Sequence, residues 1–136
     1  NKPDFKFREE SFSILISNAW ELLLKAKILH LNGNDIKSIQ IIKKQKPQVS
    51  VSGNPKTISL GKAVNILESS GMINKIVADN LKLLIEIRDE SIHFIHEDRS
   101  LEIKIQSIGT ATLKNFITLA THWFGYDFQK FNFYLM

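Results

Sequence analysis

Apolar residues recur at three- and four-residue steps over three long stretches of this chain, and this spacing limits its possible folds more than any other feature. Side chains with this spacing share one face of an α-helix. A helix that is apolar on two sides is expected at the centre of a bundle or at an interface. In the first stretch, residues 11–30, one strip is Phe12, Leu15, Ile16, Ala19, Leu22, Leu23 and Ala26, with Ile14, Leu24 and Ile28 as a second strip. Glu21 and Lys25 lie four residues apart on the side opposite the first strip, in the favourable order for a surface ion pair.

Three further helices are predicted after the first. A short one covers residues 60–70, with Ser59 as its N-cap, and a long one covers residues 73–93. The last runs from residue 101 or 107 to residue 124, with Gly109 as a possible weak point. These elements predict an all-α fold, an up-and-down bundle of four to five helices.

Length and composition indicate one domain. A chain of 136 residues can bury a core of its own, and it contains no cysteine for disulfides or thiolate metal sites. No apolar run could cross a bilayer and no signal peptide is evident, so we expect a cytoplasmic protein with no membrane partner. The first residue is Asn1 rather than Met, and we therefore expect a fragment of a longer protein.

Residues 36–58 differ in character from the helical stretches. Residues 38–41 and 48–51 alternate apolar and polar side chains, which predicts a short β-hairpin inserted after the first helix. This insert is the most basic part of a chain whose formal net charge is +4. The lysines either keep an exposed edge soluble or contact a phosphate backbone. The candidates for nucleic-acid binding are Lys43, Lys44 and Lys46.

Arg88 and Asn80 break the pattern of the helix predicted over residues 73–93. On a helical projection the polar face holds Asp79, Lys82, Glu86, Asp89, Glu90 and His93. Arg88 instead falls near the middle of the apolar face, and Asn80 lies on the same side near its edge. A buried unpaired guanidinium is strongly unfavourable, so Arg88 needs an acidic partner, carbonyl oxygens, an oligomer interface or an anionic ligand. Asn80 is a further candidate for nucleic-acid contact.

His93 and Asp89 lie four residues apart on the polar face of the same helix. A carboxylate beside an imidazole orients the ring and favours its charged form, which suits general acid–base chemistry near neutral pH. The alternative is a surface pair that only stabilises the helix slightly.

The segment Arg88-Asp89-Glu90-Ser91-Ile92-His93 resembles the Arg-x4–6-His motif of the HEPN superfamily. The first helix, with residues 18–26 reading Asn-Ala-Trp-Glu-Leu-Leu-Leu-Lys-Ala, is similar to the opening helix of many of these domains. The layout also resembles an uncharacterised bacterial family of that superfamily, with an insert after helix one and a Leu-Gly-Lys segment, here residues 60–62. The resemblance covers most of residues 11–124.

The resemblance implies a homodimer whose two motifs meet in a basic cleft and cut RNA without a metal or cofactor, in bacterial toxin–antitoxin or abortive-infection systems. Arg88 would bind the scissile phosphate, His93 would act as general acid or base, and Asp89 would orient one of them. RNA, a second copy of the chain, and an antitoxin or further domains are the implied partners. On an ideal helix Arg88 and His93 point about 140° apart, so the helix must end or bend near Ser91, or two chains must contribute.

Two other functions compete with this one. His93, His96, Glu97 and Asp98 could gather around a metal ion, although no second group of ligands is evident. Alternatively, the chain is a non-catalytic helical module for dimerisation or for binding nucleic acid or nucleotide. The aromatic tail, residues 125–136, fits such a module because its apolar side chains need a neighbour. No Gly-rich phosphate loop or Gly-x-Ser-x-Gly elbow is present.

Overall fold

The computed structural model describes residues 8–93 and 99–129, and within them the chain is all-α apart from one very short hairpin. The predicted fold class is therefore confirmed. The elements in chain order are α1 (Arg8–Leu31), the 3-10 helix η1 (Ile36–Ile39), β1 (Ile42–Lys43), β2 (Lys46–Pro47), α2 (Leu60–Ser69), α3 (Lys75–His93) and α4 (Arg99–Phe124).

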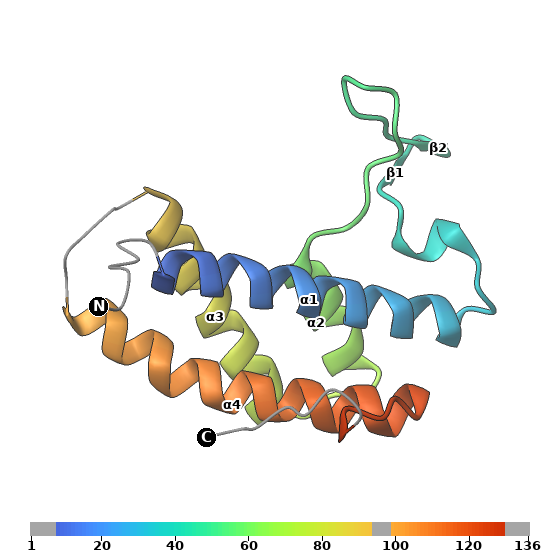
Figure 1. The fold of residues 1–136 in the computed structure, drawn as a ribbon. Coiled ribbons are helices and arrows are strands. Elements are labelled where there is room, and N and C mark those ends of the chain that lie inside the picture. Colours follow the sequence, from blue (N-terminus) through green and yellow to red (C-terminus); the bar gives the residue numbers. More distant parts are fainter. Residues whose placement is uncertain (1–7, 94–98, 130–136) are drawn as a thin grey trace.

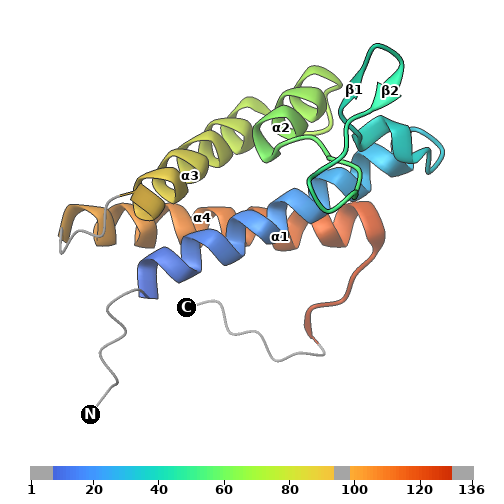
Figure 2. The same ribbon diagram turned by 90° about the horizontal axis from the view of Figure 1, so that it is seen from above.

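The helices form a bundle around α1. This helix packs on α2, α3 and α4, and α3 also packs on α4 (Figures 1 and 2). The chain runs in opposite directions along α1 and α3 and reverses again into α4, which is the predicted up-and-down arrangement (Figure 1). The start of α1, the end of α3 and the start of α4 consequently lie at the same end of the bundle in both views.

The core lies against one side of α1, and this side was only partly predicted. Trp20, Leu24 and Ile28 are almost completely buried, and the Trp20 ring meets Phe116 of α4 edge-on at 5.4 Å between ring centroids. Both predicted strips contribute to the core, since Ile16 and Leu23 of the first strip are also buried, whereas Leu15 and Leu22 of that strip are 67% and 71% exposed. The side of α1 that faces the core therefore takes residues from both strips.

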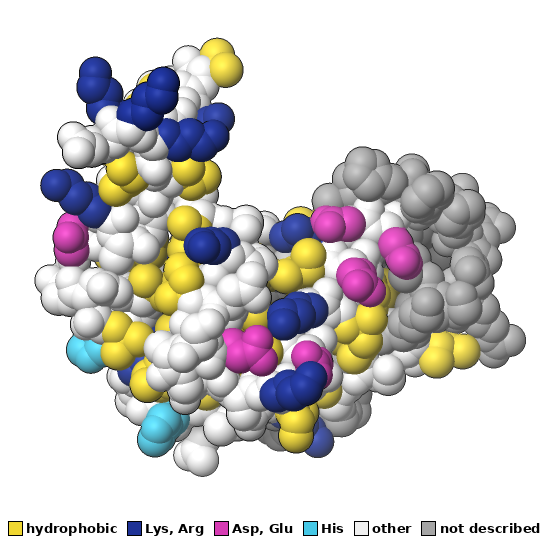
Figure 3. All heavy atoms as spheres, turned by 180° about the vertical axis from the view of Figure 1, so that it is seen from behind, with side chains coloured by type: hydrophobic (Ala, Val, Ile, Leu, Met, Phe, Trp, Pro, Cys, Tyr) yellow, Lys and Arg dark blue, Asp and Glu magenta, His cyan; other side chains and the backbone are white. Residues whose placement is uncertain are grey.

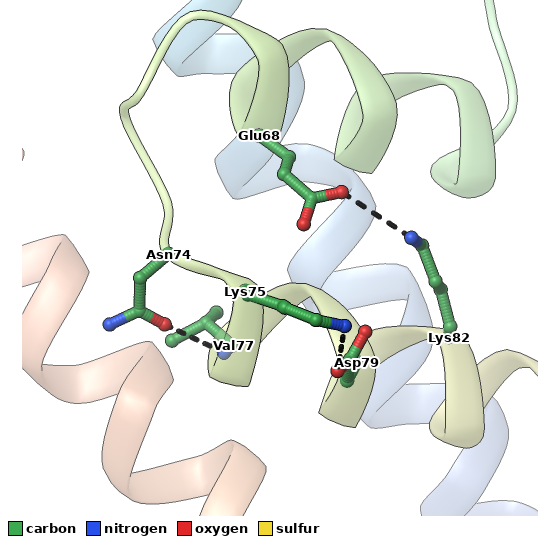
Figure 4. Close-up of polar contacts among 6 residues, drawn as sticks. All are labelled: Glu68, Asn74, Lys75, Val77, Asp79 and Lys82. Carbon is green, nitrogen blue, oxygen red and sulfur yellow. Dashed lines mark hydrogen bonds and ion pairs between the residues drawn. The ribbon is translucent and has the colours of Figure 1, made fainter.

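Local capping signals set the boundaries of α2 and α3. The Ser59 side chain accepts a hydrogen bond from the Lys62 amide at 3.1 Å, as an N-cap does, and this prediction is confirmed. Helix α3 begins two residues later than expected because the Asn74 side chain accepts a bond from the Val77 amide at 2.9 Å (Figure 4). An ion pair between Lys82 and Glu68 at 3.3 Å then joins α3 to α2.

Gly109 is a packing position and not a weak point of α4. A Cβ atom at this residue would lie 2.8 Å from Cε1 of the Phe12 ring, closer than side chains tolerate. The glycine therefore lets α4 approach the phenyl ring of α1. Beyond α4, Tyr126 and Phe128 fold back so that Phe128 meets Phe116 at 6.3 Å, while residues 130–136 of the predicted aromatic tail lie outside the described residues.

Residues 36–58, hereafter the arm, leave the bundle after α1 and project from it (Figure 1). The predicted hairpin exists, but its strands are shifted. Residues 36–39 form η1 because Asp35 caps this turn, and the paired strands are β1 and β2. Ile39 and Ile58 are buried at the base of the arm, where the Ile58 amide donates to the Ile39 carbonyl at 2.9 Å.

Candidate functional site

Arg88 lies on the arc of α3 that faces the core. Leu81 and Leu84, two turns and one turn earlier on this arc, are 0% and 2% exposed. The Arg88 side chain is 25% exposed, so it is packed along part of its length while some of it reaches solvent. Ile87 beside it is 2% exposed, so Arg88 lies at the edge of the packed side of α3, and the predicted position of an arginine on an apolar arc is present in the fold.

The guanidinium of Arg88 meets a carboxylate of its own helix. Its Nε and Nη2 atoms donate to Oδ1 of Asp89 at 3.2 and 3.1 Å. The Asp89 side chain is 56% exposed, and a solvent-accessible pair of this kind contributes roughly 0–1 kcal/mol. Of the partners that the sequence left open for Arg88, the described residues supply the acidic one, in a bond weak enough for a phosphate to replace.

The surroundings of Arg88 on α3 are acidic. Glu86 and Glu90 are both exposed within two residues of it, and Asp89 adds a third carboxylate. Acidic side chains gather at one end of the face shown in Figure 3, away from the group of lysines at its other end. Glu86 and Glu90 point away from Arg88, because residues two apart lie on nearly opposite sides of a helix, and Asp89 is the carboxylate that contacts it. The excess of negative charge on this stretch of α3 still disfavours a polyanion, so a phosphate site here needs additional positive charge.

His93 is the last residue of α3, five positions after Arg88. Its side chain lies outside the described part of the structure, as do His96, Glu97 and Asp98. The pairing of Arg88 with His93 and the role of Asp89 therefore stay predictions. Within residues 8–93 and 99–129, no three potential metal ligands gather in one place.

The remaining predicted site residues do not join Arg88. Asn80 is half-buried on α3, about 12 Å from Arg88 along the helix axis. Lys43, Lys44 and Lys46 are exposed on the arm, which projects from the opposite end of the bundle to the end of α3 (Figures 1 and 2). Among the predicted site residues whose side chains are described, Arg88 and Asp89 alone lie together, and the basic arm is separate from them.

Sequence patterns missed the function of Lys25. We expected Lys25 to pair with Glu21 on the helix surface, and the two are 3.1 Å apart, but Lys25 is buried. Its Nζ atom also donates to Oγ1 of Thr57 at 2.6 Å, so it joins α1 to the base of the arm. The only available signal was a charged residue close to the apolar strips of α1, because a partner 32 residues away leaves no periodic trace.

None of the described helices combines the length and apolarity needed to cross a membrane.

Comparisons with known proteins give one match. No curated protein and no solved structure matches the chain. A family model described as a domain of unknown function, DUF3644, matches residues 1–136. The chain therefore belongs to the DUF3644 family.

Proposed function

We propose that this domain is a metal-independent endoribonuclease of a bacterial defence or toxin-type system, active as a homodimer. The observation that carries the proposal is the position of Arg88. It lies on the core-facing arc of α3, part of its side chain reaches solvent, and it precedes His93 by five residues at the helix end. The resemblance of residues 88–93 to the HEPN motif supports the same reading.

In this reaction Arg88 exchanges Asp89 for the scissile phosphate and stabilises the charge that develops on its oxygens. His93 takes the proton of the 2′-hydroxyl as general base or gives a proton to the leaving oxygen as general acid. The 2′-oxygen bonds to phosphorus while the bond to the 5′-oxygen breaks, which leaves a 2′,3′-cyclic phosphate and a 5′-hydroxyl. No water, metal or cofactor is consumed.

A dimer would bring a second guanidinium to the phosphate. One chain offers a single Arg88, whereas two chains that meet at this end of the bundle would place two Arg88 side chains at one phosphate, with the carboxylates of both α3 helices on the outer faces. Asn80, further along α3, and the lysines of the arm would contact other parts of the RNA. An antitoxin or other domains of a longer protein would then control access to the site.

The second candidate is a non-catalytic helical module for dimerisation or for binding nucleic acid or nucleotide. The observation that favours it is the pair between Arg88 and Asp89, because an arginine satisfied within its own chain can serve structure alone. In that case loss of Arg88 would weaken folding or dimerisation and would leave no activity to lose.

Cleavage of labelled RNA in EDTA distinguishes the two candidates. The wild type is compared with Arg88→Ala, His93→Ala and the control Lys75→Ala, which removes an exposed lysine paired with Asp79. We expect both motif variants to lose activity by about a hundredfold or more while the control keeps it. Dimerisation of each variant is measured by light scattering.

Three results decide the outcome. Loss of cutting in both motif variants with unchanged dimerisation supports the nuclease. Equal cutting by all four proteins means a contaminating nuclease and overturns the assignment. An inactive wild type that still dimerises, with a dimer weakened by Arg88→Ala, supports the non-catalytic module.

A further inference from the structure

The arm carries the whole basic excess of the chain. It holds five lysines and no acidic residue: Lys37, Lys43, Lys44, Lys46 and Lys56. Because the chain has 18 basic and 14 acidic residues, the rest of the protein has 13 and 14 and a net charge of −1. All five lysines are exposed, and Figure 3 shows this basic group standing apart from the rest of the surface. A local field of this strength attracts polyanions.

The composition of the arm indicates which part of a nucleic acid it contacts. Between residues 36 and 58 there is no aromatic residue, no histidine and no arginine. Proteins that hold single strands stack the bases on aromatic rings or guanidinium planes, and the arm has neither. Lysine ammonium groups, with Ser, Asn and Gln side chains between them, suit phosphate and sugar oxygens instead.

The turn between β1 and β2 brings like charges together, and a bound polyanion would relieve their repulsion. Lys43 and Lys46 are direct partners in the β1–β2 ladder, which places two like charges on the same face of the hairpin. The residues between them, Lys44 and Gln45, have φ angles of 50° and 64°, which normally select Asn or Gly. The turn thus holds three lysines together against both charge repulsion and backbone preference.

The base of the arm is fixed to the bundle. Lys25 of α1 donates to Thr57 at 2.6 Å, and the buried Ile39 and Ile58 close the base. Backbone bonds continue outward, because the Ile41 amide donates to Lys56 and the Gln48 amide donates to Ile41. The lysines are therefore presented on a structured support, and binding loses less conformational entropy than it would with a flexible tail.

We infer that the arm binds the phosphate backbone of base-paired RNA and anchors it to the protein, with Lys43, Lys44 and Lys46 at the centre of the contact. The choice of RNA rests on the proposed function, whereas the binding itself is separable from cleavage. Helix α1, with 24 residues, separates the arm from the motif end of the bundle by about 36 Å. An A-form RNA duplex must therefore extend for roughly thirteen base pairs to reach from one to the other.

Exposed apolar residues on the arm raise one competing partner, an anionic membrane surface. Ile36, Ile42, Val49 and Val51 are all exposed on the arm. Interfacial anchors depend on Trp, Phe or Leu side chains, and the arm contains none of these. β-Branched side chains alone make a weak anchor, so the observations favour nucleic acid, and vesicles are included in the test.

The test measures binding in a His93→Ala background, which removes the proposed acid–base group and leaves Arg88 in place. The charge-neutralised variant Lys43→Gln/Lys44→Gln/Lys46→Gln is compared with Lys62→Gln/Lys75→Gln/Lys114→Gln, which removes the same charge from the bundle. The probes are a 16-base-pair RNA duplex, an unpaired 16-nucleotide RNA and vesicles containing phosphatidylserine. Affinity for each is followed as a function of salt.

We expect the arm variant to bind the duplex about tenfold or more weakly, with a salt slope reduced by about 2–3, and the bundle variant to change much less. The unpaired RNA should bind more weakly than the duplex. The inference is overturned if both triple variants bind alike, if the unpaired RNA binds tighter, or if the arm lysines matter only for vesicles. Duplex binding by a protein that never cleaves would reject the nuclease and leave the arm's role intact.

Discussion

Ser17 and Trp20 each place a polar atom in the core without a hydrogen-bond partner among the described residues. The Ser17 hydroxyl and the Trp20 indole nitrogen are fully buried on α1. A buried polar group with no partner loses its bond to water and gains nothing in return. These two atoms therefore lower the stability of the core below what this fold could reach with another sequence.

We predict that Ser17→Ala stabilises the domain by about 1 kcal/mol and raises its melting temperature by roughly 3–5 °C. The change removes the unpartnered hydroxyl and leaves the methylene contacts in place. Alanine also favours helix more than serine does, so the exposed Ser11→Ala on the same helix is the control. If both variants shift the melting temperature equally, the hydroxyl has a partner that the contacts do not reveal.

Arg88 and Lys25 show which properties of single residues can be predicted from the sequence and which cannot. Arg88 was identified because its position on a helical arc conflicts with its charge, and this conflict is visible without a structure. Its bond to Asp89 could not be chosen from the sequence, since four kinds of partner satisfied the same requirement. Lys25 was placed on the surface because its partner Thr57 reaches α1 only through the fold of the arm.

The contact between α1 and α4 depends on one glycine. Alanine at residue 109 would favour the helix by about 1 kcal/mol, but its Cβ would lie 2.8 Å from Cε1 and 3.2 Å from Cζ of Phe12. The gain in helix propensity and the clash with Phe12 oppose each other, and the outcome depends on whether the Phe12 ring can move away from the added Cβ.

A double-mutant cycle isolates this contact. We predict that Gly109→Ala is neutral or destabilising in the wild type and stabilising by about 1 kcal/mol in a Phe12→Ala background. Unfolding in urea gives the four free energies. Additive effects would show that the phenyl ring moves aside freely and that the glycine is present for another reason.

Elements were predicted best where their signals are local. Ser59 predicts the start of α2, and its side chain does cap that helix. This could be predicted because an N-cap bonds within one turn of its own position. The buried side of α1 was assigned less well. Members of both apolar strips are buried on this helix, and only the packing of the other helices decides which of them face the core. The strands of the arm were displaced because alternating residues also occur in the turn that became η1.

The bundle and the arm are separable parts of the molecule. Ile41 and Lys56 face each other, with the Ile41 amide donating to the Lys56 carbonyl at 2.9 Å. Replacing residues 42–55 by Asn-Gly should therefore close the chain with a two-residue turn. We predict that the free energy of unfolding changes by less than about 1 kcal/mol, because the deleted segment adds no fully buried side chain to the core.

Thermal unfolding followed by circular dichroism checks this prediction, and the same protein tests the arm in RNA binding. A loss of cooperative unfolding would show that the arm is part of the core.

The bundle as a whole was predictable because each helix carries its own periodic pattern of apolar residues. The distance between arm and motif was not, since the arm follows the end of α1 in the sequence but only the packing of α3 on α1 sets where the motif lies.

The uneven charge of this protein gives it an electric dipole whose positive end is the arm. One end carries five lysines, and the remainder is slightly negative. Such a molecule turns in the field of a polyanion before contact, within a range of about 8–10 Å at physiological salt. The arm is then the first part of the protein to meet the RNA, and the motif end reaches the RNA only after the molecule has been oriented. Because salt screens the long-range field first, rising salt would abolish this orientation before it abolishes binding.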